Sequence, residues 1–145
     1  MKRFTRIFCV FLAVIMLMSF PVNAEDVSPR SSSFFVGYSA FLSEVDAYNF
    51  KVYFRVTAKR TMDELGAYTV KVQISDDGED WATTQTYTKE DYPSFICEDT
   101  FLHAYSFNYN GSKGYYYRAI ITLYAKDSTG TAKYTVYTAP IQLGV

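Results

Sequence analysis

Cysteine, histidine and tryptophan are scarce in this sequence. Its 145 residues include two cysteines, one histidine and one tryptophan. Cys9 lies in an apolar N-terminal run, so removal of that run leaves Cys97 alone and excludes an intramolecular disulfide. A structural zinc site needs three or four Cys, His or carboxylate ligands. Without residues 1–24 the chain offers one cysteine and one histidine, Cys97 and His103. The composition therefore argues against both a disulfide scaffold and a zinc centre.

Motifs of common catalytic centres are also missing. The chain has no Gly-x-Ser-x-Gly, no His-Glu-x-x-His and no glycine-rich loop that cradles phosphate. Cys97 and His103 are the one nucleophile–base pair that the composition leaves open. His103 shares the alternating face of Phe101 and Tyr105, and Cys97 has apolar neighbours, which favours a packed histidine and a buried thiol. We expect no enzyme and no cofactor, with a Cys/His hydrolase as the remote alternative.

One long apolar run is present, at the N-terminus. Residues 1–6 are largely basic, residues 7–20 are apolar, and a Val-x-Ala site ends at Ala24. This order is typical of a secretory signal peptide, and the run is shorter than the ~20 residues of a membrane-spanning helix. We predict an N-terminal signal helix, cleavage after Ala24, and a secreted, extracellular protein without a membrane anchor.

Charge of one sign is not in large excess. Removing residues 1–24 leaves 11 basic and 15 acidic residues, a net charge of −4. A mildly acidic domain lacks the basic footprint that nucleic acid or an anionic membrane requires, so we expect neither as a partner. Residues 25–33 contain Pro29 and three serines, which predicts a flexible lead-in. Residues 34–145 suit a single domain, which we expect to be monomeric.

Alternation of apolar and polar residues dominates the rest of the chain. The clearest stretch is Gly114–Lys126, whose odd positions are all apolar or aromatic. Because side chains of a strand alternate between two faces, this pattern predicts a long strand with one buried face. Further strands are predicted from similar patterns at residues 34–42, 48–58, 68–74, 82–87, 94–97, 101–109 and 131–143.

Two breaks in the alternation predict connections. Residues 59–66 fit a one-turn helix that ends at Gly66, with Met62 and Leu65 plugging the core. Residues 110–114 begin with Asn-Gly, which favours a hairpin-type connection. Seven or eight strands without a long helical pattern predict an all-β, antiparallel β-sandwich with an immunoglobulin or fibronectin-like arrangement.

One local resemblance supports this fold class. Residues 115–119 (YYYRA) follow a glycine and precede Ala125 and a glycine-containing turn. This stretch resembles the penultimate strand of fibronectin type III domains. The resemblance implies that a tyrosine near the start of the strand, Tyr117 or Tyr115, bonds back to the backbone at a corner. The Cys…Trp…Cys pattern of antibody domains is absent.

A second resemblance covers nearly the whole mature chain. It rests on YSA at 38–40, TMDELGA at 61–67, QISDDG at 73–78 with Trp81, and the Gly-Tyr-Tyr strand. Together these segments are similar to a group of small secreted proteins from Gram-positive, largely gut-dwelling bacteria, a domain of unknown function. The resemblance implies a secreted bacterial β-domain and assigns no functional residues.

An acidic turn is the first candidate site. It contains four carboxylates around Gly78: Asp76, Asp77, Glu79 and Asp80. Oxygen ligands in a loop suit calcium, although the spacing fits an EF-hand poorly. The Asp-x-Gly-x-x-Trp order that ends at Trp81 resembles an Asp-box hairpin, in which an aspartate caps backbone N–H groups and the tryptophan packs underneath. We favour that structural turn over a calcium site, and both over an acid/base pair of a hydrolase.

Tyrosines on predicted solvent-facing strand positions are the second candidate site: Tyr53, Tyr116, Tyr124 and Tyr137. A tyrosine ring is apolar with a polar tip, which suits stacking on a sugar or on a protein partner. Ordinary cross-strand packing of surface tyrosines is the competing interpretation. The sequence thus predicts a non-catalytic extracellular binding module for an unknown protein or glycan, with a carbohydrate-binding module using this tyrosine face as the alternative.

Overall fold

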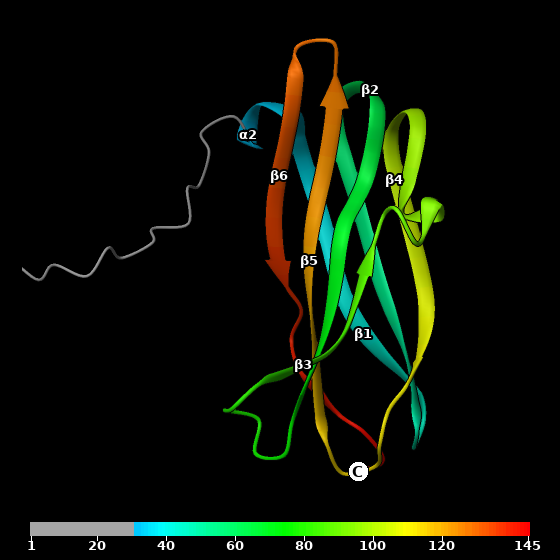
Figure 1. Ribbon diagram of the computed structural model, residues 1–145, viewed down its shortest axis with the longest axis vertical. Coiled ribbons are helices and arrows are strands. Elements are labelled where there is room, and N and C mark those ends of the chain that lie inside the picture. Colours follow the sequence, from blue (N-terminus) through cyan, green and yellow to red (C-terminus); the bar gives the residue numbers. More distant parts are fainter. Residues whose placement is uncertain (1–30) are drawn as a thin grey trace, which may run out of the picture.

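The computed structural model describes residues 31–145, which form one antiparallel sheet of seven strands (Figure 1). A one-turn helix, α2 (Ser31–Phe34), precedes the strands. These are β1 (Phe35–Asp46), β2 (Asn49–Ser75), β3 (Ala82–Thr88), β4 (Ile96–Asn110), β5 (Tyr116–Asp127), β6 (Gly130–Tyr137) and β7 (Ile141–Gln142). A 3₁₀ turn, η1 (Pro93–Phe95), leads into β4. The prediction of an all-β antiparallel fold is confirmed. The predicted signal helix lies outside the described residues.

The long strand β2 organises the sheet. Its first part, residues 49–57, pairs with β1 on one side and with β4 on the other. Its second part pairs with β5 on one side and with β3 and the start of β4 on the other. Figure 1 shows β2 curving back between the two parts, so that β1 lies behind β5. The sheet therefore curls over its own inner face.

The core lies on that inner face. Alternate side chains of β2 and β5 are fully buried, as the alternation predicts, because successive residues of a strand point to opposite sides. The largest fully buried side chains of these two strands are Phe50, Phe54, Met62, Leu65, Tyr117, Ile121 and Leu123. Each such side chain contributes about 1.5–3 kcal/mol when it leaves water. The predicted buried face of residues 114–126 is confirmed from Tyr117 onward.

The predicted one-turn helix at residues 59–66 is wrong. This segment continues β2, and its end pairs with both β4 and β5. A single helical turn gains few hydrogen bonds for the backbone entropy it loses, so two strand partners outcompete it. Met62 and Leu65 are nonetheless fully buried, as predicted.

The hairpin predicted at residues 110–114 is also wrong. β4 and β5 both pair with β2, but the described residues show no pairing between β4 and β5. The connection instead crosses from one part of the curled sheet to the other. The Gly111 N–H donates to Tyr48 O and the Gly114 N–H to Leu143 O. Asn-Gly chemistry predicts a turn, but it does not determine which strands pair.

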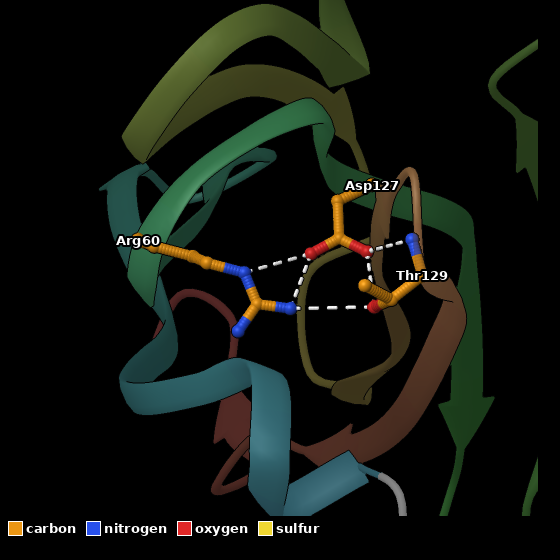
Figure 2. A network of polar contacts seen from close by, with 3 residues as sticks. All are labelled: Arg60, Asp127 and Thr129. Carbon is orange, nitrogen blue, oxygen red and sulfur yellow. Dashed lines mark hydrogen bonds and ion pairs between the residues drawn. The ribbon is translucent and has the colours of Figure 1, made fainter.

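A polar network links β2 to the end of β5 where β2 curves back (Figure 2). Nε of Arg60, on β2, donates to Asp127 at the end of β5 over 2.8 Å, and its Nη2 also contacts Thr129. The Thr129 hydroxyl and N–H both donate to Asp127. The Arg60 guanidinium lies 5.5 Å from the Phe34 ring centre, so the same network reaches α2.

This network predicts acid sensitivity. The Thr129 hydroxyl, helped by the Thr129 N–H and Arg60, lowers the pKa of Asp127 to about 2 from 3.8. A lowered folded-state pKa gives stability that is present above pH ~4 and is lost as the pH falls towards ~2. We expect Asp127→Asn to lower the melting temperature at pH 6 and the difference from wild type to shrink as the pH falls from 4 to 2.5. Asp63→Asn, which removes an exposed carboxylate from β2, is the matched control, and a pH-independent difference for Asp127→Asn would contradict the argument.

Candidate ligand-binding face

The four predicted site tyrosines do not share one face. Tyr53 lies on the first part of β2 and stacks on Phe41 of β1, with ring centres 4.6 Å apart. Tyr116 and Tyr124 lie on β5 and Tyr137 on β6. Because the two parts of β2 pair with different strands, the curl of the sheet separates Tyr53 from the other three.

Exposure differs among the remaining three tyrosines. Tyr137 is 56% exposed, Tyr116 is half-buried, and Tyr124 is 6% exposed. The prediction that Tyr124 faces solvent is therefore wrong. A register shift between Ala67 and Thr69 accompanies the packing of Tyr68 against Tyr124, with ring centres 5.6 Å apart. A bulge of this kind re-aims a side chain, which simple alternation does not anticipate.

Cations cover these two rings. Lys133 Nζ, from β6, lies 3.3 Å from the Tyr68 ring centre. Lys89 Nζ, from the loop after β3, lies 4.6 Å from the Tyr124 ring centre. A cation over an aromatic face is attracted by the negative π surface and is thereby held in place. Tyr68, Tyr124, Lys89 and Lys133 form a first ring–cation cluster.

Glu64 is shared between two ammonium groups beside this cluster. Its carboxylate accepts hydrogen bonds from Lys89 and Lys126, each over 3.0 Å. The Lys89 hydrogen bond, followed by that of Lys126, lowers the pKa of Glu64. The same contacts raise the pKa of Lys89 and of Lys126. One carboxylate thus partners two cations, which leaves a local positive charge.

A second ring–cation cluster surrounds Arg118 on β5. The guanidinium carbon lies 4.4 Å from the Trp81 ring centre and 5.8 Å from that of Tyr137. Arg118 Nε donates to Gln73 Oε1 over 2.7 Å, and Gln73 in turn donates to the hydroxyl of Thr83. The guanidinium is therefore held by two rings and one amide before any ligand arrives.

Both clusters lie on the same outer face. Arg118 and Tyr124 occupy outward positions of β5, and exposed Lys71 lies opposite Ile120, between them. We call this surface the aromatic–basic face. It consists of Tyr68, Lys71, Trp81, Lys89, Arg118, Tyr124, Lys126, Lys133 and Tyr137. Sequence reasoning identified two of its tyrosines and missed its cations, although four of them lie at alternating strand positions.

Acidic features border this face at two places. A surface hollow of about 490 Å³ adjoins Lys89 and Glu64 and is also lined by Glu90, Pro93, Ile96 and Glu98. At the Arg118 end, Gly78 of the acidic turn lies against the Tyr116 ring, with φ +80°.

The acidic turn has the geometry of a capped loop. Asp77 Oδ1 accepts the N–H groups of Glu79 and Asp80 over 2.8 and 2.9 Å, and also the Ser75 hydroxyl. The Asp80 N–H, followed by that of Glu79, lowers the pKa of Asp77 to about 2. The capping carboxylate is thus Asp77 rather than Asp76. No group of three or more Cys, His, Asp or Glu among residues 31–145 is arranged to hold a metal ion.

Cys97 and His103 both lie on β4. Cys97 is opposite Leu65 and His103 is opposite Val56. Among residues 31–145 no hydrogen bond joins the two side chains, and the Cys97 thiol instead lies 3.8 Å from the Glu98 carbonyl oxygen. His103 Nε2 instead lies 3.1 Å from the Ser94 carbonyl oxygen, and burial lowers the pKa of the imidazole. The structure does not assemble the nucleophile–base pair.

Comparison with known proteins gives distant likenesses of shape. No protein-family model matches the chain, and no curated protein matches it. A structural-genomics target, SoR45, covers 80% of this chain and 89% of its own at 11% identity and a TM-score of 0.48. The sporulation control protein Spo0M from Bacillus subtilis covers 70% and 48% at 10% identity and a TM-score of 0.39. At these values neither likeness carries an argument about function. Among residues 31–145, no helix is long and apolar enough to cross a membrane.

Proposed function

We propose that this chain is a secreted, non-catalytic binding module that takes its ligand on the aromatic–basic face. The observation that carries the proposal is the alignment of two ring–cation clusters on one face of the sheet. Lysine and arginine side chains that already lie over aromatic rings lose less conformational entropy when a ligand binds than free ones would. Tyr137, at 56% exposure, adds an open apolar surface beside them.

The scaffold that we propose is a β-sandwich of immunoglobulin or fibronectin-like type. Two features support it. The strands pair in the orders β1–β2–β4 and β3–β2–β5–β6 around the two parts of β2. The Tyr117 hydroxyl accepts the Ser112 N–H over 2.8 Å, a bond back to the backbone like the one that the fibronectin resemblance implies. Such scaffolds present binding surfaces on rigid strands.

An extracellular location is part of the same proposal. Its support is the basic start, the apolar run and the Val-x-Ala site of residues 1–24. Outside the cell, the ligand would be a surface polymer or an extracellular protein. Expression of the full sequence in a secreting host should then deliver a protein that begins at Glu25 into the medium, which N-terminal sequencing would establish.

A retention assay tests the binding proposal. The secreted protein is incubated with insoluble polysaccharides and purified cell walls, and the bound fraction is measured. We expect retention on at least one of these materials and at least a tenfold loss for Tyr137→Ala combined with Arg118→Gln, because these changes remove the open ring and the cation beside it. Tyr53→Ala, on the separate surface beside Phe41, serves as the matched control.

Two results would contradict the proposal. One is equal retention of wild type, the face variant and the Tyr53→Ala control. The other is an equal loss of retention in the face variant and in Tyr53→Ala while circular dichroism shows that both variants keep the melting temperature of wild type.

A further inference from the structure

We infer that the ligand of the aromatic–basic face is an anionic polysaccharide that lies along β5 and contacts both ring–cation clusters. This inference rests on the proposed function and names the chemical class of the ligand.

Charge is distributed unevenly between this face and the rest of the domain. Residues 31–145 contain 10 basic and 13 acidic residues, a net charge of −3. Five of the 10 basic residues belong to the face: Lys71, Lys89, Arg118, Lys126 and Lys133. Among the outward positions of β5, β6 and residues 64–75, Glu64 is the one carboxylate. Lys71, Arg118, Lys126 and Lys133 occupy these same positions, so an acidic domain carries a local excess of about three positive charges there, which attracts an anionic ligand.

The spacing of the cations favours a polymer. Arg118 and Lys126 are eight residues apart on β5, about 26 Å at the rise of a strand. Lys71 lies opposite Ile120, between the two clusters. A single small anion cannot contact both ends of such a row, whereas a chain with repeated negative charges can contact every cation along it.

Acidic neighbours define the path. The Asp77 turn lies beyond Arg118 at one end, and the hollow beside Lys89 is lined by Glu90 and Glu98. Both would repel a polyanion. The remaining path runs over β5 and β6, where Thr122 and Thr135 lie opposite each other between the clusters.

This surface fits a polysaccharide better than a nucleic acid or a protein. Single-stranded nucleic acids stack their bases on free ring faces, but cations already lie over the rings of Tyr68, Trp81 and Tyr124. Protein interfaces have an apolar centre, and here the centre holds Lys71 and threonines around Ile120. Threonine hydroxyls beside ordered cations match the hydroxyls and the acidic groups of a charged sugar chain.

Binding to soluble polymers tests the inference. The probes are dextran sulfate, polygalacturonate, neutral dextran and single-stranded DNA, with affinities measured by biolayer interferometry at low and high NaCl. We expect binding to dextran sulfate, to polygalacturonate or to both, with the two distinguishing sulfate from carboxylate recognition. We expect no binding to neutral dextran. The affinity for the anionic polymers should fall about tenfold or more as added NaCl shortens the Debye length from about 14 to about 4 Å.

Matched charge variants locate the site. Lys71→Gln combined with Lys133→Gln should weaken polyanion binding about tenfold or more, while loss of the Lys133–Tyr68 contact lowers the melting temperature only slightly. Lys51→Gln combined with Arg55→Gln, on the Tyr53 surface, should leave it unchanged although it removes the same charge. Equal effects of the two pairs, or equal affinity for single-stranded DNA, would overturn the inference.

Failure of this inference differs from failure of the proposed function. A neutral glycan that is retained by wild type and lost in the Tyr137→Ala, Arg118→Gln variant would overturn the polyanion assignment and leave the binding face in place. Binding that is unchanged in the charge variants and in the ring variant would overturn the inference and the proposed function together.

Discussion

Gly66→Ala is expected to destabilise the domain more than any other exchange of one glycine for alanine. Gly66 is buried in β2 and pairs with Ile96 of β4 and Tyr124 of β5. A Cβ at this position would lie 1.8 Å from the Phe95 carbonyl oxygen and 3.1 Å from His103 Cδ2. The first contact is with backbone, so no side-chain rotation can relieve it. We expect a loss of about 3 kcal/mol or more in the free energy of unfolding, as for severe overpacking of a core.

Urea denaturation followed by tryptophan fluorescence would measure this loss. Gly37→Ala is the matched control, because Gly37 lies in β1 and nothing would lie within 4 Å of its added Cβ. That variant should be nearly neutral or slightly more stable, since alanine restricts the unfolded chain. Equal midpoints for the two variants would show that the backbone at Gly66 yields without cost.

Gly66 also shows how far local patterns reach. The sequence predicts that the structure requires a glycine at position 66, and the clash that a Cβ would make there confirms this. The predicted reason, the end of a one-turn helix, is wrong, because the requirement comes from the carbonyl of Phe95, 29 residues further along the chain. Alternation predicts the strands at residues 48–58, 68–74 and 114–126 well, since burial of one face is a local property of the strand. Which strands pair is a long-range property, and the hairpin predicted at residues 110–114 fails for that reason.

The same distinction between local and long-range properties applies to the candidate site. Tyr137 is exposed as its alternation predicts, because neither a bulge nor a neighbouring ring intervenes. Tyr124 is buried by Tyr68, whose orientation accompanies a register shift. Lys89 and Lys133 reach the cluster from a loop and from β6, and no spacing in the sequence places them over the same pair of rings.

Removing the ring of Tyr117 and removing its hydroxyl are expected to have separable effects. The side chain is 2% exposed and packs against Phe50 and Tyr109, with ring centres 5.0 and 6.0 Å away. Tyr117→Ala should therefore cost about 3–5 kcal/mol, as for other buried aromatic residues. Tyr117→Phe keeps the packing and loses the bond that the Ser112 N–H donates over 2.8 Å, at about 1–1.5 kcal/mol.

Tyr115→Phe provides the matched control, because Tyr115 is 43% exposed and lies just before β5. We expect its urea midpoint to equal that of wild type. A Tyr117→Phe midpoint that also equals wild type would mean that water replaces the Ser112–Tyr117 hydrogen bond at no cost. The Tyr117 hydroxyl binds Ser112 in the connection from β4 to β5, and Arg118 is the residue after Tyr117. Tyr117→Phe should therefore weaken ligand retention only if it moves Arg118 from its place over Trp81. In this way the connection from β4 to β5 helps to set the geometry of the aromatic–basic face.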